Sequence, residues 1–139
     1  TDMSLFLVIL PSNTGSGRYI VDFGESSANS IIAGYTANVE VYDSPRLSMG
    51  SSSTSLPNLY TLVRNATTPL TSTFKNGAAV TSSGSINSTP AAATWRIGAT
   101  SVGTFPYAGD FAELIIYDND IGATNRASVE AYLISKYAL

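Results

Sequence analysis

The hydrophobic and polar residues of the chain repeat mostly with the two-residue period of β-strands. Val39 and Val41 alternate with polar side chains between Asn38 and Tyr42, which is the pattern of a strand with one buried face. Residues 18–23 alternate in the same way. This second alternation is predicted to put Tyr19, Val21 and Phe23 on one face and Arg18, Ile20 and Asp22 on the other.

The first predicted strand, Met3 to Leu10, has a different pattern. It is apolar on both faces and ends at Pro11, before the turn-forming residues 13–17. Apolar runs of this length are typical of strands that are covered on both sides. We therefore predict that it lies at the centre of a sheet. Further strands are predicted at residues 31–33, 45–49, 59–64, 95–99 and 111–117.

Residues 71–80 are predicted to form a β-hairpin. Asn76 and Gly77 lie in the middle of this segment. A type I′ turn needs positive φ at both central residues, and Asn followed by Gly adopts that conformation most readily.

Residues 123–136 have the period of an α-helix. Val129, Tyr132, Leu133 and Tyr137 follow the spacing of a single helical face, so this stripe is predicted to dock on the strands. The side chains expected to face water are those of Arg126, Ser128 and Glu130.

These elements predict an all-β fold, an antiparallel β-sandwich (jelly roll) with one C-terminal α-helix. About nine or ten short strands without helix-length crossovers favour antiparallel over parallel pairing. A chain of 139 residues has room for one core. We therefore expect a single domain over residues 1–139, as part of a longer polypeptide.

The end of the chain carries a recognisable motif. A Gly109-Asp-Phe-Ala-Glu strand that ends in Tyr117-Asp is followed by a helix that contains Tyr132-Leu and Lys136-Tyr. This segment resembles the end of laminin G-type jelly-roll domains of the concanavalin A-like lectin/glucanase superfamily, of phage and bacterial surface type. The hairpin at Asn76-Gly77 agrees with that pattern. The resemblance implies the sandwich fold and recognition at its surface.

Charge and composition exclude several classes of function. The net charge is −3 and the seven basic residues are scattered, so no basic stripe is present to bind a row of phosphates. The chain has no cysteine and no histidine, which excludes disulfides, Cys-type zinc sites and proton transfer by imidazole. Its longest apolar run, Leu5–Leu10, is far shorter than the roughly 20 residues that span a bilayer. We predict neither nucleic-acid binding nor membrane insertion.

No catalytic residues are predicted, and the chain is interpreted as a non-enzyme. Glycoside hydrolases with such sandwiches use two carboxylates roughly 5–9 Å apart, which an acid-x-acid pair on one strand would supply. No predicted strand has such a pair, and Asp118 and Asp120, which have the spacing, fall in a turn. The serine-rich segments lack a base to activate a nucleophile.

Two further acidic features are interpreted as structural. Asp118, Asn119 and Asp120 offer oxygen ligands to Ca²⁺, but no further ligands are identifiable. We interpret the segment as an Asx-turn before the helix and predict no metal or cofactor. Glu113 is predicted to pair with Arg96 on a neighbouring strand; the alternative is a contact with a sugar hydroxyl.

Aromatic residues are the candidates for ligand contact. Tyr42 and Tyr107 are predicted to bind the ligand, because aromatic rings stack on sugars and Tyr107 lies in a loop. Tyr35 is a further aromatic of this kind, whereas Trp95 is predicted to belong to the core. Asn65 and Asn87 begin Asn-x-Thr or Asn-Ser-Thr sequences that match glycosylation acceptors.

Two functions fit these observations. The first is a non-catalytic carbohydrate-binding or adhesion module of a secreted or surface protein. The second is a structural or decoration domain of a virion, such as a phage capsid or tail, or of another surface assembly. Both predict an extracellular or virion-surface location and, as partners, a glycan, a protein surface or other protein chains in an assembly.

Overall fold

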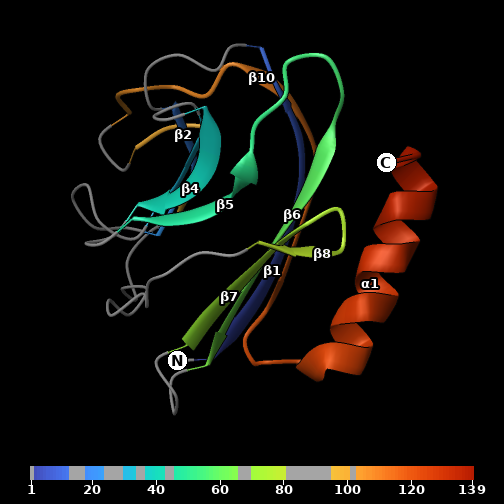
Figure 1. Ribbon diagram of the computed structural model, residues 1–139. Coiled ribbons are helices and arrows are strands. Elements are labelled where there is room, and N and C mark those ends of the chain that lie inside the picture. Colours follow the sequence, from blue (N-terminus) through green and yellow to red (C-terminus); the bar gives the residue numbers. More distant parts are fainter. Residues whose placement is uncertain are drawn as a thin grey trace.

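The computed structural model describes residues 2–12, 18–23, 30–33, 37–42, 46–65, 70–80, 95–100 and 103–139, and leaves out the side chain of Leu70. Within these residues, ten strands form two antiparallel sheets and one helix follows them (Figure 1). The predicted β-sandwich with a C-terminal helix is confirmed. None of the described helical residues form a helix long and apolar enough to cross a membrane.

The two sheets have five strands each. Sheet A has the order β10–β1–β6–β7–β8, and sheet B has the order β5–β4–β3–β2–β9. The strands of sheet A are β1 (Met3–Pro11), β6 (Asn58–Asn65), β7 (Leu70–Lys75), β8 (Ala78–Val80) and β10 (Gly109–Tyr117). Those of sheet B are β2 (Arg18–Asp22), β3 (Ser30–Ala33), β4 (Asn38–Tyr42), β5 (Leu47–Ser51) and β9 (Arg96–Ile97).

The main core lies between the two sheets. Leu5, Leu7 and Ile9 of β1 are fully buried there with alternate residues of sheet B. Val39 and Val41 belong to this core, so the predicted inward face of β4 is confirmed. The alternation works because side chains one residue apart on a strand point to opposite sides of the sheet.

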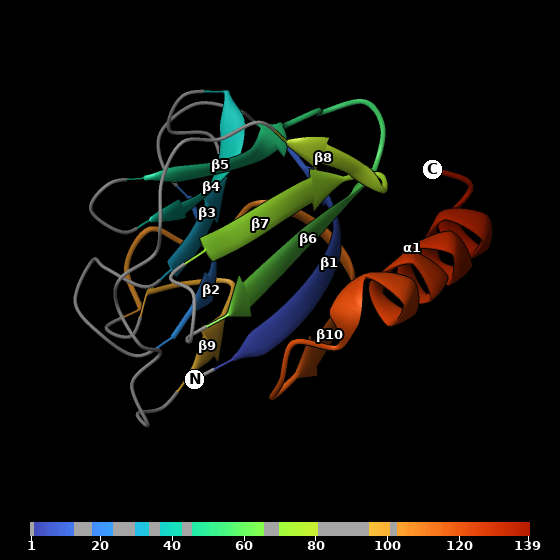
Figure 2. The same cartoon turned by 60° about the horizontal axis from the view of Figure 1, so that its bottom comes forward.

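The strand β1 is buried on its other face too. Phe6 and Val8 of β1 and Leu59 of β6 form a second cluster with Leu133 of the helix α1 (Gly122–Tyr137). The helix lies along the outer side of sheet A (Figure 2). The central position predicted for this strand is confirmed, since β1 pairs with both β10 and β6.

The face that α1 turns to the sheet differs from the predicted stripe. Leu133 is buried and Val129 and Tyr137 are partly buried, as predicted, but Tyr132 is 55% exposed and Glu130 is 3% exposed. At about 100° per residue, Glu130 lies on the same side of a helix as Leu133, whereas Tyr132 lies roughly 100° away. The prediction that Glu130 faces water is wrong, because Glu130 forms an ion pair with Arg126 against the sheet.

A bulge changes the predicted faces of β2. Tyr19 pairs with Ile32 and Val21 pairs with Ile31, so one extra residue, Ile20, is inserted in β2. Ile20 turns into the core beside Val21, while Tyr19 shares a face with Ile32. The prediction that Tyr19 and Val21 share a face is therefore wrong.

The hairpin at β7 and β8 is confirmed. Asn76 has a φ of 48° and Gly77 a φ of 79°, as a type I′ turn requires. The Asn76 side chain also accepts a hydrogen bond from the Leu59 amide at 2.8 Å, which ties the turn to β6.

We expect Leu133→Ala to destabilise the protein strongly, because Leu133 is fully buried against β1 and β6. Chemical denaturation should show a loss of about 2–5 kcal/mol in the free energy of unfolding. Tyr132→Ala is the control on the same helix, and it should change that free energy by no more than about 0.5 kcal/mol. Equal losses in the two variants would contradict the observed docking of α1.

Candidate functional site

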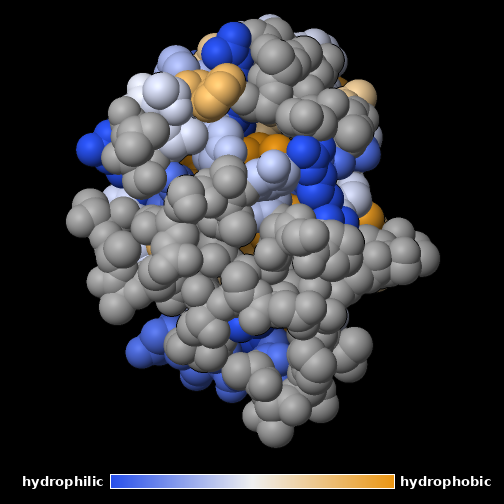
Figure 3. All heavy atoms as spheres, turned by 90° about the vertical axis from the view of Figure 1, so that its left-hand side faces the viewer, coloured by the Kyte–Doolittle hydropathy of each residue, from blue (hydrophilic) through white to orange (hydrophobic). Residues whose placement is uncertain are grey.

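The outer face of sheet B carries a group of polar and aromatic side chains. Strand register places Tyr42, Ser30, Asp22 and Arg96 in one row, and Glu40, Ile32 and Tyr19 in the next. These rows lie on the face opposite to the core residues. Figure 3 looks onto this side of the molecule, where hydrophilic and hydrophobic described residues lie next to one another. We call this face, together with Arg46 and Phe105, the sheet B surface.

Arg46 links two residues of β4 on this surface. Its Nη1 lies 3.8 Å from Oε2 of Glu40, and its guanidinium carbon lies 4.6 Å from the centre of the Tyr42 ring. Glu40 is buried, and a buried carboxylate needs a charged or hydrogen-bonding partner. The ion pair and the cation–π contact together fix the guanidinium next to the Tyr42 ring.

The phenol of Tyr19 is influenced by its burial and by the nearby side chains of Tyr42, Asp22 and Arg46. Burial raises the pKa of its phenol above the ordinary value of 10.0; Tyr42 and Asp22 raise it further, and Arg46 lowers it. The phenol is therefore a neutral hydrogen-bond donor at physiological pH. Asp22 accepts a hydrogen bond from the Ser30 hydroxyl at 3.2 Å. The half-buried Tyr19 thus has a carboxylate, a second phenol and a guanidinium around it.

Phe105 continues this surface at the edge of sheet B. Its ring centre lies 6.1 Å from that of Tyr19, and its carbonyl accepts a hydrogen bond from the Tyr19 amide at 3.1 Å. Phe105 is 59% exposed. Its φ of 51° is a left-handed conformation, which costs about 1–2 kcal/mol for a residue with a side chain. The neighbouring Thr104 shares a hydrogen bond with the Thr100 hydroxyl at 2.8 Å.

Other apolar side chains are exposed along the same edge. Trp95 is 40% exposed and Ile97 is 60% exposed. The Trp95 ring meets the buried Phe23 ring edge-on, with 4.9 Å between the centres. Trp95 therefore packs on the core with part of its ring while the rest of it remains in solvent.

The structure places the two predicted ligand-binding residues on different sides of sheet B. Tyr42 is half-buried on the sheet B surface. Tyr107 packs against the core between the sheets; the pKa of the neighbouring Tyr60 is raised by burial and then by Tyr107. Burial, and then Asp110, raise the pKa of Tyr107 itself. Tyr42 and Tyr107 are therefore not brought together, and their roles in binding stay predictions.

Glu113 has a different partner from the predicted one. Its Oε2 accepts hydrogen bonds from Lys136 Nζ at 2.9 Å and from the Tyr137 hydroxyl at 2.8 Å. Arg96 belongs to sheet B and Glu113 to sheet A, so the predicted pair is wrong. The returning helix supplies both partners, and they hold the pKa of Glu113 below its ordinary value of 4.5.

The turn before α1 has the expected Asx geometry. Oδ1 of Asp120 accepts a hydrogen bond from the Gly122 amide at 2.9 Å, and Oδ2 accepts one from the Asn65 side chain at 3.3 Å. The described residues contain no group of three His, Cys, Asp or Glu side chains that could hold a metal ion. Tyr35 and Asn87 lie outside the described residues.

Three residues of the sheet B surface had not been predicted as ligand contacts. Tyr19 was assigned to the face that carries Val21, because a bulge leaves no trace in simple alternation. Arg46 and Phe105 lie outside the described strands, so no periodicity indicates their direction. The Pro106 that follows Phe105 favours extended backbone at the residue before it, so the sequence indicates the opposite of the observed positive φ.

The fold of this chain is similar to that of several solved structures. No family model and no curated protein sequence matches it. A protein from Bacteroides ovatus described as a putative carbohydrate-binding protein is similar, with a TM-score of 0.69, 15% identity, and coverage of 87% of this chain and 38% of that one. The CBM40 domain of an IT-sialidase from Ruminococcus gnavus, bound to α2,3-sialyllactose, has a TM-score of 0.67 and 9% identity, over 93% of this chain and 82% of that one.

The NanB sialidase of Streptococcus pneumoniae is also similar, with a TM-score of 0.65 and 13% identity. The alignment covers 91% of this chain and 23% of the sialidase, so the chain spans less than a quarter of that protein. At such identities a likeness establishes the fold and nothing finer. The chain has the β-sandwich fold of these carbohydrate-binding domains, and the laminin G type in particular is not shown.

We expect the contribution of Glu113 to stability to depend on pH. A lowered pKa means that the contribution is complete above the ordinary value of 4.5 and is lost as the pH falls through the lowered value. The wild type should therefore exceed Glu113→Gln in the free energy of unfolding by a constant amount between about pH 6 and pH 8. The difference should shrink below pH 4.5 in denaturation series at each pH. A difference that stays constant into the acid range would contradict this assignment.

Proposed function

We propose that this chain is a non-catalytic carbohydrate-binding module that binds glycans on the sheet B surface. The likeness to domains described as carbohydrate-binding supports this proposal at the level of the fold. The observation that carries it is the presence of two contacts on one face of sheet B, the cation–π contact between Arg46 and Tyr42 and the ring contact between Tyr19 and Phe105. This arrangement presents aromatic rings and hydrogen-bonding groups on the same surface.

Such a surface suits the chemistry of a sugar. The apolar C–H faces of a pyranose pack on aromatic rings, and its hydroxyls exchange hydrogen bonds with phenols, guanidinium groups and carboxylates. Phe105 supplies an exposed ring, and Tyr42 and Arg46, both partly exposed, supply donors. Asp22 and Glu40 are buried, so their part is to hold Tyr19 and Arg46 in place.

The conformation of Phe105 also supports a role in binding. Strained residues gather at functional sites, and the ring of Phe105 contacts Tyr19 while more than half of the residue stays in solvent. Here the strain turns a large aromatic ring into solvent instead of into the core.

The carboxylates of this surface do not resemble a hydrolytic pair. Asp22 accepts a hydrogen bond from Ser30, and Glu40 is paired with Arg46. The two carboxyls of a glycosidase must flank the glycosidic bond, and here both carboxylates are buried. We therefore propose binding without hydrolysis, in a secreted or surface protein. A role as a virion or assembly domain stays a prediction.

We expect Phe105→Ala and Tyr42→Ala to weaken glycan binding. The wild type is first screened on a broad glycan array, and the best oligosaccharide is then titrated by calorimetry. Loss of a stacked ring typically costs about 1–3 kcal/mol, which is roughly a five- to 150-fold weaker dissociation constant. Tyr107→Ala is measured beside them, because the sequence predicts that Tyr107 binds the ligand.

The control is Tyr132→Ala, which removes an aromatic ring of similar exposure, 55% against 59% for Phe105. Tyr132 lies on α1, on the other side of the sandwich, so this variant should bind like the wild type. A wild-type chain that binds no glycan on the array would refute the proposed function. Binding that survives both Phe105→Ala and Tyr42→Ala would refute the proposed location.

A further inference from the structure

A second concave surface lies on the opposite side of the sandwich, between the start of α1 and sheet A. Its volume is about 210 Å³. Val63, Ser72 and Phe74 line it from β6 and β7, and Asp120, Ala123 and Arg126 line it from the start of the helix. We call it the helix groove.

The groove follows from how α1 docks. The buried anchor of the helix, Leu133, lies in its second half and packs over β1 and β6. Val63 and Phe74 lie on the outer face of sheet A, and both are only half-buried. The first half of α1 therefore leaves part of an apolar sheet face open beside its polar side chains.

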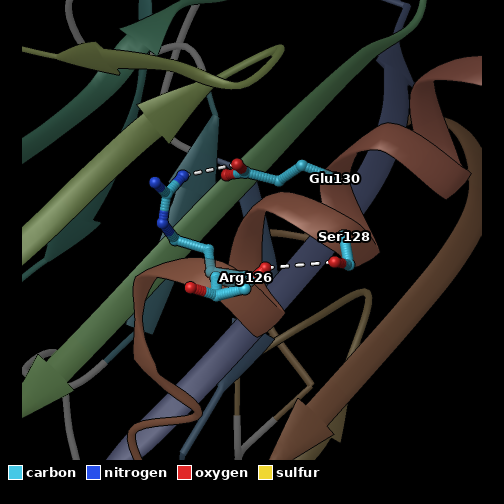
Figure 4. Close-up of polar contacts among 4 residues, drawn as sticks. Arg126, Ser128 and Glu130 are labelled. Atoms are coloured by element: carbon cyan, nitrogen blue, oxygen red, sulfur yellow. Dashed lines mark hydrogen bonds and ion pairs between the residues drawn. The ribbon is translucent and has the colours of Figure 1, made fainter.

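Arg126 is held rigidly at the wall of this groove. Its guanidinium carbon lies 3.7 Å from the centre of the Phe74 ring, and its Nη1 forms an ion pair with Oε2 of Glu130. Figure 4 shows both side chains extending from α1 toward each other, while Ser128 bonds back to its own helix. A guanidinium has five N–H donors, so donors remain for a ligand after the bond to Glu130.

Two buried acceptors lie next to these residues. Oε1 of Glu130 and Oγ1 of Thr61 have no hydrogen-bond partner within the part of the chain that the structure describes. Glu130 is the partner of Arg126, and Thr61 is paired across the sheet with Phe74. Both atoms are buried, and neither residue lines the groove, so the hydrogen bonds offered to an occupant come from the remaining donors of Arg126 and from the Ser72 hydroxyl.

The charges favour a neutral occupant. The charge of Arg126 is balanced by Glu130, and an anion would meet the carboxylate of Asp120. A cation would find one carboxylate, whose two oxygens already accept hydrogen bonds from Gly122 and Asn65. Neutral hydroxyls can both donate and accept here, while Val63 and Phe74 pack against C–H groups.

The size favours a small molecule. Pockets for drug-sized ligands have roughly 300–1,000 Å³, and the helix groove has about 210 Å³. We propose that the helix groove binds a neutral, hydroxyl-rich molecule of the size of a single sugar ring. It is a second carbohydrate site, separate from the sheet B surface, and it rests on the chemistry of the groove and not on that of the first site.

The test is an NMR titration of the ¹⁵N-labelled chain with three probes, D-glucose, D-galactose and L-arabinose. At least one of them should cause saturable shifts of the Gly122 and Ala123 amides and of the Arg126 side-chain Nε–H. Sodium acetate and sodium phosphate serve as anionic probes. Absence of saturable shifts with all three sugars would overturn the proposal, as would saturation by the anions without saturation by any sugar.

Two variants fill the groove from opposite walls, Ser72→Phe from β7 and Ala123→Leu from α1. Both positions are exposed, so a bulkier side chain can enter the groove without displacing core residues. Each folded variant should bind the effective sugar at least about tenfold more weakly. Unchanged affinity in either of them would contradict the proposal.

Ser128→Ala is the control on the same helix, because Ser128 bonds only to the Thr124 carbonyl among its described contacts. It should leave the sugar titration unchanged. Phe105→Ala separates the two sites. It should weaken oligosaccharide binding at the sheet B surface and leave the shifts at Gly122 and Ala123 as they are. Loss of the groove shifts in Phe105→Ala would show that the groove is not a separate site.

Discussion

The burial of β1 on both faces is the constraint on which the rest of the structure depends. Leu5, Leu7 and Ile9 fill the space between the sheets, and Phe6 and Val8 point the other way. The outward pair would be exposed without a second cover, at an unfavourable free energy of about 1.5–3 kcal/mol for each side chain. A helix over sheet A is therefore required, and the chain supplies it immediately after β10.

The helix makes the two outer faces of the sandwich different. Sheet A uses its outer face for packing, and Glu113 ties the last turn of α1 to β10. Sheet B carries Asp22, Glu40 and Tyr19 outward instead. Asp22 and Glu40 are buried and held by Ser30 and Arg46, and the half-buried Tyr19 has a phenol that can donate a hydrogen bond. The helix therefore covers the outer face of sheet A with apolar packing, whereas polar side chains line the outer face of sheet B.

The period of the chain predicts the architecture well, because burial acts on every second residue of a strand. The hydrophobic pattern predicts the strand β1 with two buried faces and the C-terminal helix, and the turn preference of Asn76–Gly77 predicts the hairpin; the structure contains all three. The hydrophobic period mispredicts the direction of a side chain where strand pairing or an ion pair determines that direction. The bulge at Ile20 reverses Tyr19, and Glu130 is buried because Arg126 accompanies it. Neither event is visible in a list of hydrophobic positions.

The candidate surface was harder to predict than the fold for the same reason. Tyr42 lies on a regular strand and was found, whereas Phe105 takes its direction from a backbone with positive φ. That backbone is held on one side by the hydrogen bond from the Tyr19 amide to the Phe105 carbonyl, next to the bond between the Thr100 and Thr104 hydroxyls. The neighbouring Tyr107 is turned into the core by the same loop. Phe105 is exposed and Tyr107, two residues later, packs on the core. The backbone of this segment therefore has to be known before either ring can be predicted to face solvent or the core.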